Sequence, residues 1–348
     1  MTNCRHLIAR SLATIVVFLS LSHYAISQSS GDRSVIDAHN LDKLQIFYSL
    51  DISDVFDTEF WTVPVALVVS PDDRWIGVVA GQGTCIVDVN SEFQIYAIPF
   101  TSNENVEFLS QDRIVSMSSD GILEIWDINT SEMQVIELTN IDEAILDIDV
   151  NVFLNLLVAV TSSQVYIWDT NEFVLQQEIV IPPISSSDLS TFVYISPSGE
   201  FIVVDPPTPQ FFILDRENEE VIEEIEQVGW ARIDLYDSNI LIYTNTSPDS
   251  LLRFNFETPT RDGYMLLTEA ISQEEMLWIP DVSPVSGIMI FTDYLGNINI
   301  ADHDGSVLRT LSAHNGPVFQ YRFSSLGRYI VSADNSLNNK MIIWNVDG

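Results

Sequence analysis

The sequence is poor in positive charge. Its 348 residues include 14 Lys and Arg against 50 Asp and Glu, a formal net charge of −36 at pH 7. The lysines are Lys43 and Lys340 alone. Such a surface repels nucleic acid and anionic lipid headgroups. We therefore expect neither as a partner, although the same acidity could also reflect a saline habitat.

Long apolar runs are scarce, and the clearest one lies near the start. Residues 11–22 read "SLATIVVFLSLS", with Arg5 and Arg10 before them and the small residues Ala25 and Ser27 after them. This is the layout of a secretory signal peptide cleaved near Ser27, and the run is short for a membrane span of about 20 residues. We expect residues 1–27 to be removed, leaving a secreted or otherwise extracytoplasmic protein without a stable membrane span. The alternative is an uncleaved anchor.

Residues that hold metals or act as nucleophiles are also few. After loss of residues 1–27 one cysteine remains, Cys85, which cannot form an internal disulfide and is interpreted as a buried apolar residue. Three histidines remain, His39, His303 and His314, so no three-histidine metal site is expected on the folded part. The motifs G-x-S-x-G, C-x-x-C, H-E-x-x-H, the Walker loop and G-x-G-x-x-G are absent from the sequence. We expect no catalytic, cofactor-binding or metal-binding residues.

What the sequence does have is a repeat. Its "WD" pairs, exact or degenerate, end seven apolar runs that lie 39 to 47 residues apart. The pairs are Val87-Asp88, Trp126-Asp127, Trp168-Asp169, Leu214-Asp215, Phe254-Asn255, Ala301-Asp302 and Trp344-Asn345. Short runs rich in Val, Ile, Tyr and Phe alternate with turn residues within each unit, which indicates about four strands per repeat. Four strands per unit of about 40–45 residues are typical of a β-propeller blade.

The last unit carries the most specific signal. Residues 312–346 contain His314, Ser332 and Trp344 at positions that resemble the WD-repeat (tryptophan–aspartate repeat) family of β-propellers. That resemblance implies a hydrogen-bonded chain of His, Ser or Thr, Trp and a turn Asp that staples a blade. Asp120, six residues before Trp126, matches the turn aspartate in the second unit. Asn338 occupies that place in the last unit, so no unit is expected to keep all four residues.

The two ends of the chain suggest how the ring closes. The last unit supplies three strands, and residues 41–50, "LDKLQIFYSL", resemble an outer strand. We predict an all-β, seven-bladed β-propeller over residues 43–348, closed by an N-terminal strand that joins the C-terminal blade. Residues 28–42 are interpreted as a polar leader, and removal of residues 28–38 is expected to change stability little.

Several clusters invite a functional interpretation, and each also has a structural one. The "ADHDG" stretch, with Asp302, His303 and Asp304, could hold Ca²⁺ but fits a turn better. Residues 216–227 contain six glutamates that could collect a cation or dock a basic partner, but fit a solvated outer strand better. The glutamates are Glu217, Glu219, Glu220, Glu223, Glu224 and Glu226. Asn129 and Asn245 begin N-x-S/T sequons in expected turns.

Candidate contact residues are three tryptophans outside the repeat positions, Trp61, Trp230 and Trp278. They precede expected inner strands and would lie near the mouth of the central channel. The resemblance implies a non-enzymatic platform for a protein partner whose identity the sequence does not specify. The alternative is a secreted hydrolase of lactones or glycans, with carboxylates and Ca²⁺ at the channel mouth. No cofactor is expected in the first case.

Overall fold

The structure is a computed structural model. It describes residues 33–52, 64–81, 83–101, 105–138, 141, 143–184, 191–206, 210–226, 231–233, 240–244, 250–254, 261–266, 280–302, 305–335 and 339–347. Apart from one turn of 3₁₀ helix, η1 (Leu41–Lys43), every regular element in those ranges is a β-strand.

The strands form four-stranded antiparallel sheets, seven within the described residues. Blades 1 to 4 contain β2 (Pro64–Val69), β3 (Trp75–Ala80), β4 (Gly83–Asp88) and β5 (Gln94–Ile98); β6 (Asn105–Phe108), β7 (Arg113–Met117), β8 (Ile122–Asp127) and β9 (Glu132–Glu137); β10 (Asp147–Asn151), β11 (Leu156–Val160), β12 (Gln164–Asp169) and β13 (Val174–Val180); and β14 (Phe192–Ile195), β15 (Phe201–Asp205), β16 (Gln210–Asp215) and β17 (Glu220–Glu226). Blades 5 to 7 contain β18 (Ala231–Ile233), β19 (Ile240–Thr244), β20 (Ser250–Phe254) and β21 (Arg261–Leu266); β22 (Asp281–Val282), β23 (Met289–Thr292), β24 (Asn297–Ala301) and β25 (Val307–Ser312); and β26 (Val318–Phe323), β27 (Ile330–Asp334) and β28 (Lys340–Asn345) with β1 (Gln45–Asp51).

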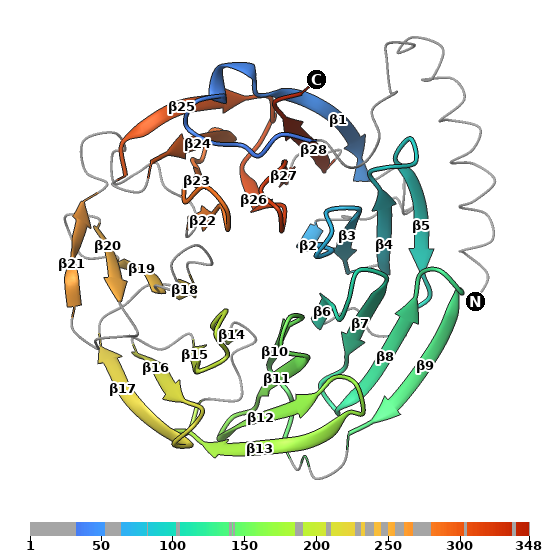
Figure 1. Cartoon of the computed structure of the whole chain (residues 1–348), viewed down its shortest axis with the longest axis vertical. Helices are drawn as coiled ribbons and strands as arrows, with labels where there is room; N and C mark the ends of the chain where they lie inside the picture. Colours follow the sequence, from blue (N-terminus) through green and yellow to red (C-terminus); the bar gives the residue numbers. More distant parts are fainter. Residues whose placement is uncertain are drawn as a thin grey trace.

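The blades surround a common centre, with the first strand of each blade innermost and the fourth at the rim (Figure 1). The predicted all-β propeller is therefore confirmed. The turns between first and second strands, and those between third and fourth strands, lie on one face of this ring, because successive strands of a blade alternate in direction. We call this the turn face.

Burial explains why the sequence forms this ring. Second strands such as β3 and β11 are buried along their whole length, because the neighbouring blades cover both of their sides. The outer strand β13 alternates between exposed and half-buried side chains along most of its length, since one side of it faces water. A single four-stranded blade could not cover both of its own sides, so the stability of each blade depends on its neighbours.

The predicted closure is confirmed. Strand β1 pairs antiparallel with β28, with Gln45 opposite Asn345 and Asp51 opposite Lys340. Burial along the closing segment is uneven, because Ile46 is 46% exposed whereas Leu44, just before the strand, is buried. The outermost strand of the C-terminal blade thus comes from the other end of the chain.

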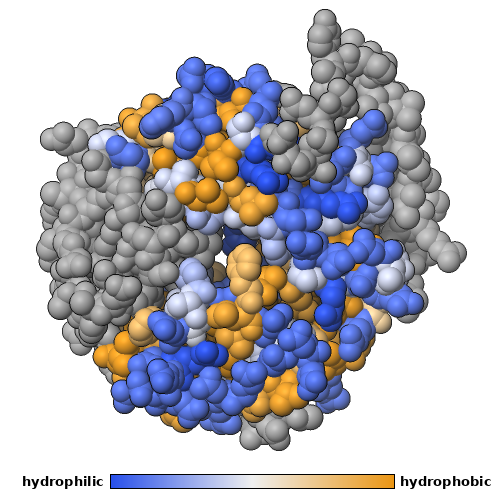
Figure 2. All heavy atoms as spheres, viewed as in Figure 1, coloured by the Kyte–Doolittle hydropathy of each residue, from blue (hydrophilic) through white to orange (hydrophobic). Residues whose placement is uncertain are grey.

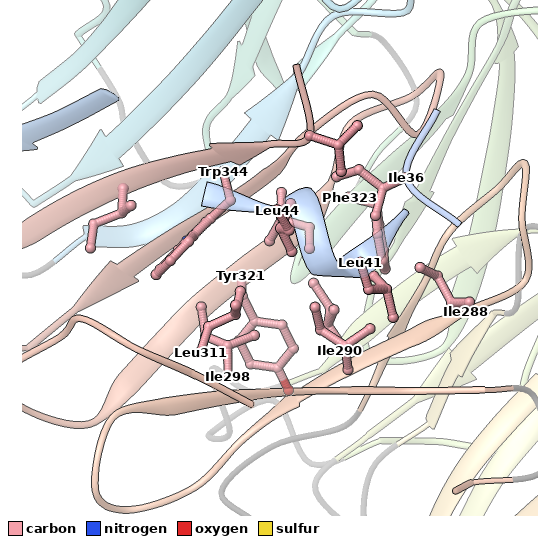
Figure 3. Close-up of a cluster of buried hydrophobic side chains, with 14 of the residues drawn as sticks. Ile36, Leu41, Leu44, Ile288, Ile290, Ile298, Leu311, Tyr321, Phe323 and Trp344 are labelled. Carbon is pink, nitrogen blue, oxygen red and sulfur yellow. The ribbon is translucent and has the colours of Figure 1, made fainter. Parts of the chain in front are cut away.

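The leader does more than the sequence suggests. Residues 33–44 lie across blade 7, and Ile36 is fully buried, in a cluster between blades 6 and 7 that also holds Leu41 and Leu44 (Figure 3). The N–H of Ile36 donates to the carbonyl oxygen of Gly327 at 2.8 Å, and its own carbonyl oxygen accepts from the hydroxyl of Ser286 at 2.8 Å. The sequence did not reveal this burial, because one apolar residue in a polar stretch has no strand pattern, and a buried Ile36 argues against the expectation that removal of residues 28–38 changes stability little.

The proposed signal peptide, residues 1–27, lies outside the described residues. In the part of the chain that the structure covers, no helix has the length and apolarity to cross a membrane.

Candidate functional site

A buried polar network lies inside blade 7. The indole N–H of Trp344 donates to the Ser332 hydroxyl oxygen at 2.9 Å, and that oxygen lies 2.7 Å from Nε2 of His314. The other ring nitrogen of His314, Nδ1, lies 3.1 Å from Asp334 Oδ2. The four-residue chain implied by the family resemblance is therefore present, which corrects the expectation that no unit keeps it. Asp334 replaces Asn338 in the chain, and Asn338 lies outside the described residues.

The side chains of Ser332, His314 and Asp334 follow one another in the order of a nucleophilic triad, but their burial does not suit that role. A catalytic serine needs an oxygen that a substrate can reach. Ser332 is fully buried, and its oxygen already accepts the proton of the Trp344 indole. The carboxylate of Asp334 also accepts a backbone N–H from Lys340 at 2.8 Å. This cluster fastens strands β27 and β28 to each other and to the segment that precedes β26.

Asp120, the candidate for the same role in blade 2, lies elsewhere. Its side chain is exposed and accepts a hydrogen bond from Ser118 in its own turn. Trp126 is only half-buried, and the buried Glu124 beside it accepts from the N–H and hydroxyl of Thr101 at 2.5 and 2.6 Å. In blade 2, sequence spacing was therefore not enough to identify the partners.

The carboxylates on the inner strands bear on the hydrolase alternative. The first strand of each blade has an edge that no strand of its own blade covers, and aspartates of the preceding blade accept N–H groups from it. These bonds join Asp147 to Val193 at 2.9 Å, Asp149 to Ile195 at 2.8 Å and Asp281 to Phe323 at 2.5 Å. Desolvation raises the pKa of Asp147 well above its usual range, and the bond from Val193 opposes that rise. These aspartates link neighbouring blades.

The other sequence candidates are placed as follows. Asp302 accepts the N–H of Ser306 at 2.8 Å and thus belongs to a turn, while His303 and Asp304 lie outside the described residues. The glutamate run forms the outer strand β17 and the turn before it, with Glu217, Glu219 and Glu220 exposed. Within the described ranges, no three His, Cys, Asp or Glu side chains are grouped to hold a metal ion.

The remaining sequence candidates divide into those outside the described residues and those within them. Trp61, Trp230 and Trp278 lie outside the described residues, as does the sequon at Asn245. The sequon at Asn129 is exposed in the turn after β8, and the Asn129 amide donates to Asp112 at 2.5 Å. Cys85 is buried and free, as expected, and burial raises its pKa to about 12. Such a thiol does not act as a nucleophile near neutral pH.

Sequence reasoning missed one surface residue, Phe153. It stands in the turn between β10 and β11 and is 87% exposed, more than any other large apolar side chain of the described residues. Four other turns at this position read "SPDDR", "SPSGE", "SPVSG" and "SSLGR", whereas this one reads "NVFLN". The signal was therefore available as a departure from the polar turns of the other units. The face seen in Figure 2 carries apolar residues beside its central opening.

Four turns of blades 3 and 4 are linked to one another, and one of them carries Phe153. They are residues 151–155, 169–173, 196–200 and 215–219, and we call them the four-turn surface. The Asn151 amide donates to the carbonyl oxygens of Ser196 and Pro197, at 3.0 and 3.2 Å. A Cβ on Gly199, whose φ is +71°, would lie 2.4 Å from Cδ1 of Leu154, so this leucine rests directly on the glycine. Two turns of neighbouring blades are thereby held together.

The remaining bonds complete the surface. The N–H of Thr170 donates to the carbonyl oxygen of Asn155 at 2.8 Å, and the N–H of Arg216 donates to that of Glu200 at 2.9 Å. From β13, the Gln177 amide reaches the carbonyl oxygen of Arg216 at 2.9 Å and Glu219 Oε1 at 3.2 Å. The four turns therefore form one connected surface.

The comparisons with known proteins agree with this geometry. Residues 305–345 match the family model described as WD domain, G-beta repeat. The match runs from β25, the outer strand of blade 6, to β28 of blade 7, so the sequence repeat is offset by one strand from the structural blade. That offset is why the last blade needs β1 to complete it. A search of curated proteins found no significant match to the chain.

Proposed function

We propose that this chain, which its matched repeat and its ring of four-stranded sheets make a WD-repeat β-propeller, is an extracytoplasmic and non-enzymatic platform for another protein. WD-repeat propellers typically serve as scaffolds for protein–protein interaction, and the fold supports that role here. The observation that carries the proposal is the rigid turn face, on which an apolar side chain is displayed without a partner from the described part of the chain. A displayed side chain on a rigid support loses little entropy when a partner binds it.

The extracytoplasmic part of the proposal rests on the arginines, apolar run and small residues of positions 1–27. N-terminal sequencing of the protein isolated from its own cells tests it. A mature protein that begins near Gln28 and fractionates outside the cytoplasm supports export. An intact Met1 on a cytoplasmic protein contradicts it.

The platform role has its own test. Chemical cross-linking in intact cells, followed by purification in both directions, should recover one protein in a defined ratio to the propeller. A screen of ester, lactone, peptide and glycoside substrates, with and without Ca²⁺, should show no turnover above background. An activity lost in the Asp149→Asn variant would contradict the platform role and favour the hydrolase.

A further inference from the structure

We propose that the four-turn surface is the docking site for a partner protein, and that it binds a segment rich in Lys or Arg with an apolar group that covers Phe153. The inference rests on the proposed platform function and adds the site and the chemistry of the partner. Three features carry it: the exposed Phe153, the carboxylates of the four turns, and a similar contact that the leader makes elsewhere on the turn face.

The anchor is Phe153. Its ring is 87% exposed at the tip of its turn, while the next residue, Leu154, is partly held against Gly199 at 41% exposure. Aromatic side chains contribute disproportionately to protein interfaces when a partner removes them from water. Because Leu154 and the bond from Asn151 fix the turn, binding would need little rearrangement of Phe153.

The carboxylates set the charge of the partner. Six carboxylates belong to the four turns, with Arg216 as their one basic residue. They are Asp169, Glu172, Glu200, Asp215, Glu217 and Glu219. The four glutamates are exposed, so they are available to a partner. Like charge on the turns that adjoin an apolar side chain favours a partner of opposite charge, speeds its association and excludes acidic competitors.

The molecule contains a covered version of such a contact. On blade 7 the leader hydrogen-bonds through Ile36 to Gly327, and three residues earlier the Arg33 guanidinium donates to the carbonyl oxygen of Val89, in the turn between β4 and β5, at 3.2 Å. The other contact of this guanidinium, with the ring of Phe47 at 5.0 Å, stays within the N-terminal segment. The nearby carboxylates of Asp73 and Asp347 favour the charge on Arg33, although burial lowers its pKa. One cation and one apolar anchor thus hold an extended segment across turns of this face. This is the partner chemistry inferred for blades 3 and 4.

The test uses the full chain and a labelled peptide of leucine and lysine, with its leucines on one helical face, followed by fluorescence anisotropy. A second peptide replaces every leucine with serine, and a third replaces every lysine with glutamate. We expect Phe153→Ser to weaken binding of the first peptide about tenfold. The serine peptide should bind weakly and with no dependence on Phe153, and the glutamate peptide should not bind.

Matched variants separate this site from general attraction to an acidic protein. Leu295→Ser removes another exposed apolar residue, 75% exposed in the turn between β23 and β24, and should leave binding of the leucine–lysine peptide unchanged. Glu172→Gln with Glu200→Gln should weaken that binding more than Glu132→Gln with Glu137→Gln on β9, although both pairs remove two exposed carboxylates. All positions are exposed, so circular dichroism should show unchanged folding.

The outcomes are distinct. Four results would overturn the proposed surface. The leucine–lysine peptide could bind Phe153→Ser as tightly as wild type, lose as much affinity in Leu295→Ser as in Phe153→Ser, or fail to bind wild type. The glutamate peptide could also bind as tightly as the leucine–lysine peptide. A cellular partner whose cross-linking ignores Phe153→Ser would overturn the surface and leave the platform role standing. Failure to recover any partner would instead contradict the platform role itself.

Discussion

Two regions of the turn face differ in what covers them. In blades 3 and 4 the turns 151–155 and 196–200 are open, whereas in blades 6 and 7 the turns 283–287 and 324–328 lie under the leader. Their backbones are alike: Gly199 has φ +71° and Gly327 has φ +66°. The Ser196 hydroxyl accepts the N–H of Phe201 at 3.0 Å, as that of Ser324 accepts the N–H of Tyr329 at 3.2 Å.

The side chains at the two regions have opposite environments. Ile36 on the covered turns is fully buried, while Phe153 on the open turns is 87% exposed. Ile36 belongs to the segment that lies on top of its turns, whereas Phe153 belongs to a turn itself, so the difference comes from whether a covering segment is present. The leader supplies that segment where blades 6 and 7 meet, and no segment of the described residues supplies it at blades 3 and 4. The comparison shows that a repeated turn can either be covered by another segment of the chain or remain open as a surface.

The largest expected effect is on the covered region. Deletion of residues 41–50 removes most of β1, its ladder to β28 and the buried Leu41 and Leu44. We expect the melting temperature to fall by more than about 10 °C, because an exposed strand edge and lost apolar burial cost several kcal/mol together. Differential scanning calorimetry measures the change. Addition of a synthetic peptide of residues 33–52 should restore part of it, and a melting temperature equal to that of the full chain would contradict the closure.

A matched pair of substitutions compares the two regions directly. Ile36→Ala leaves a cavity in the cluster between blades 6 and 7, which should lower the free energy of unfolding by about 2–5 kcal/mol. Phe153→Ala removes a larger side chain but should change that free energy by less than about 0.5 kcal/mol, because the ring is already in water. Urea unfolding measures both. Similar losses from the two variants would mean that the regions do not differ as described.

The smallest expected effect is a pH dependence of stability that arises where blade 1 meets blade 7. Asp73 joins blade 1 to blade 7 through the hydroxyl of Ser324 at 2.8 Å and the N–H of Leu326 at 2.9 Å. Burial raises the pKa of Asp73 from 3.8 to about 6, against the effect of those two bonds. Since the folded state binds the proton more tightly, this contribution to stability is complete below about pH 3.8 and is lost as pH rises through about 6.

Unfolding at pH 5 and pH 7.5 measures the part of that contribution lost between these two values, expected to be about 1.4 kcal/mol. Asp73→Asn should remove it while its amide oxygen keeps the hydrogen bond from the N–H of Leu326, and Glu200→Gln on the open surface should leave the pH dependence unchanged. Part of the dependence should persist in Asp73→Asn, because the pKa of Asp147 is raised in the same direction. If the pH dependence of stability is unchanged in Asp73→Asn, Asp73 is not the group that binds the proton.

Much of the fold was predictable because it follows from local pattern. The repeat at Trp126, Trp168 and Trp344 predicted the strands and their ends, and the missing fourth strand predicted the pairing of β1 with β28. The polar network was predictable only in part. Asp334 could not be identified from spacing, since it stands ten residues before Trp344, whereas the six-residue spacing seen in the second unit points to Asn338.

The candidate surface was less accessible from the sequence. Its tryptophan candidates lie outside the described residues, and Phe153 was missed, although the turn that carries it departs in sequence from the polar turns of the other units. The sequence alone determined the all-β repeat, the acidity and the need for a strand from the other end, because each depends on composition or on contacts between successive segments. Only the tertiary structure decided that Ile36 is buried and Phe153 exposed. Burial depends on which distant segments meet, and the two turn backbones are too alike to reveal it.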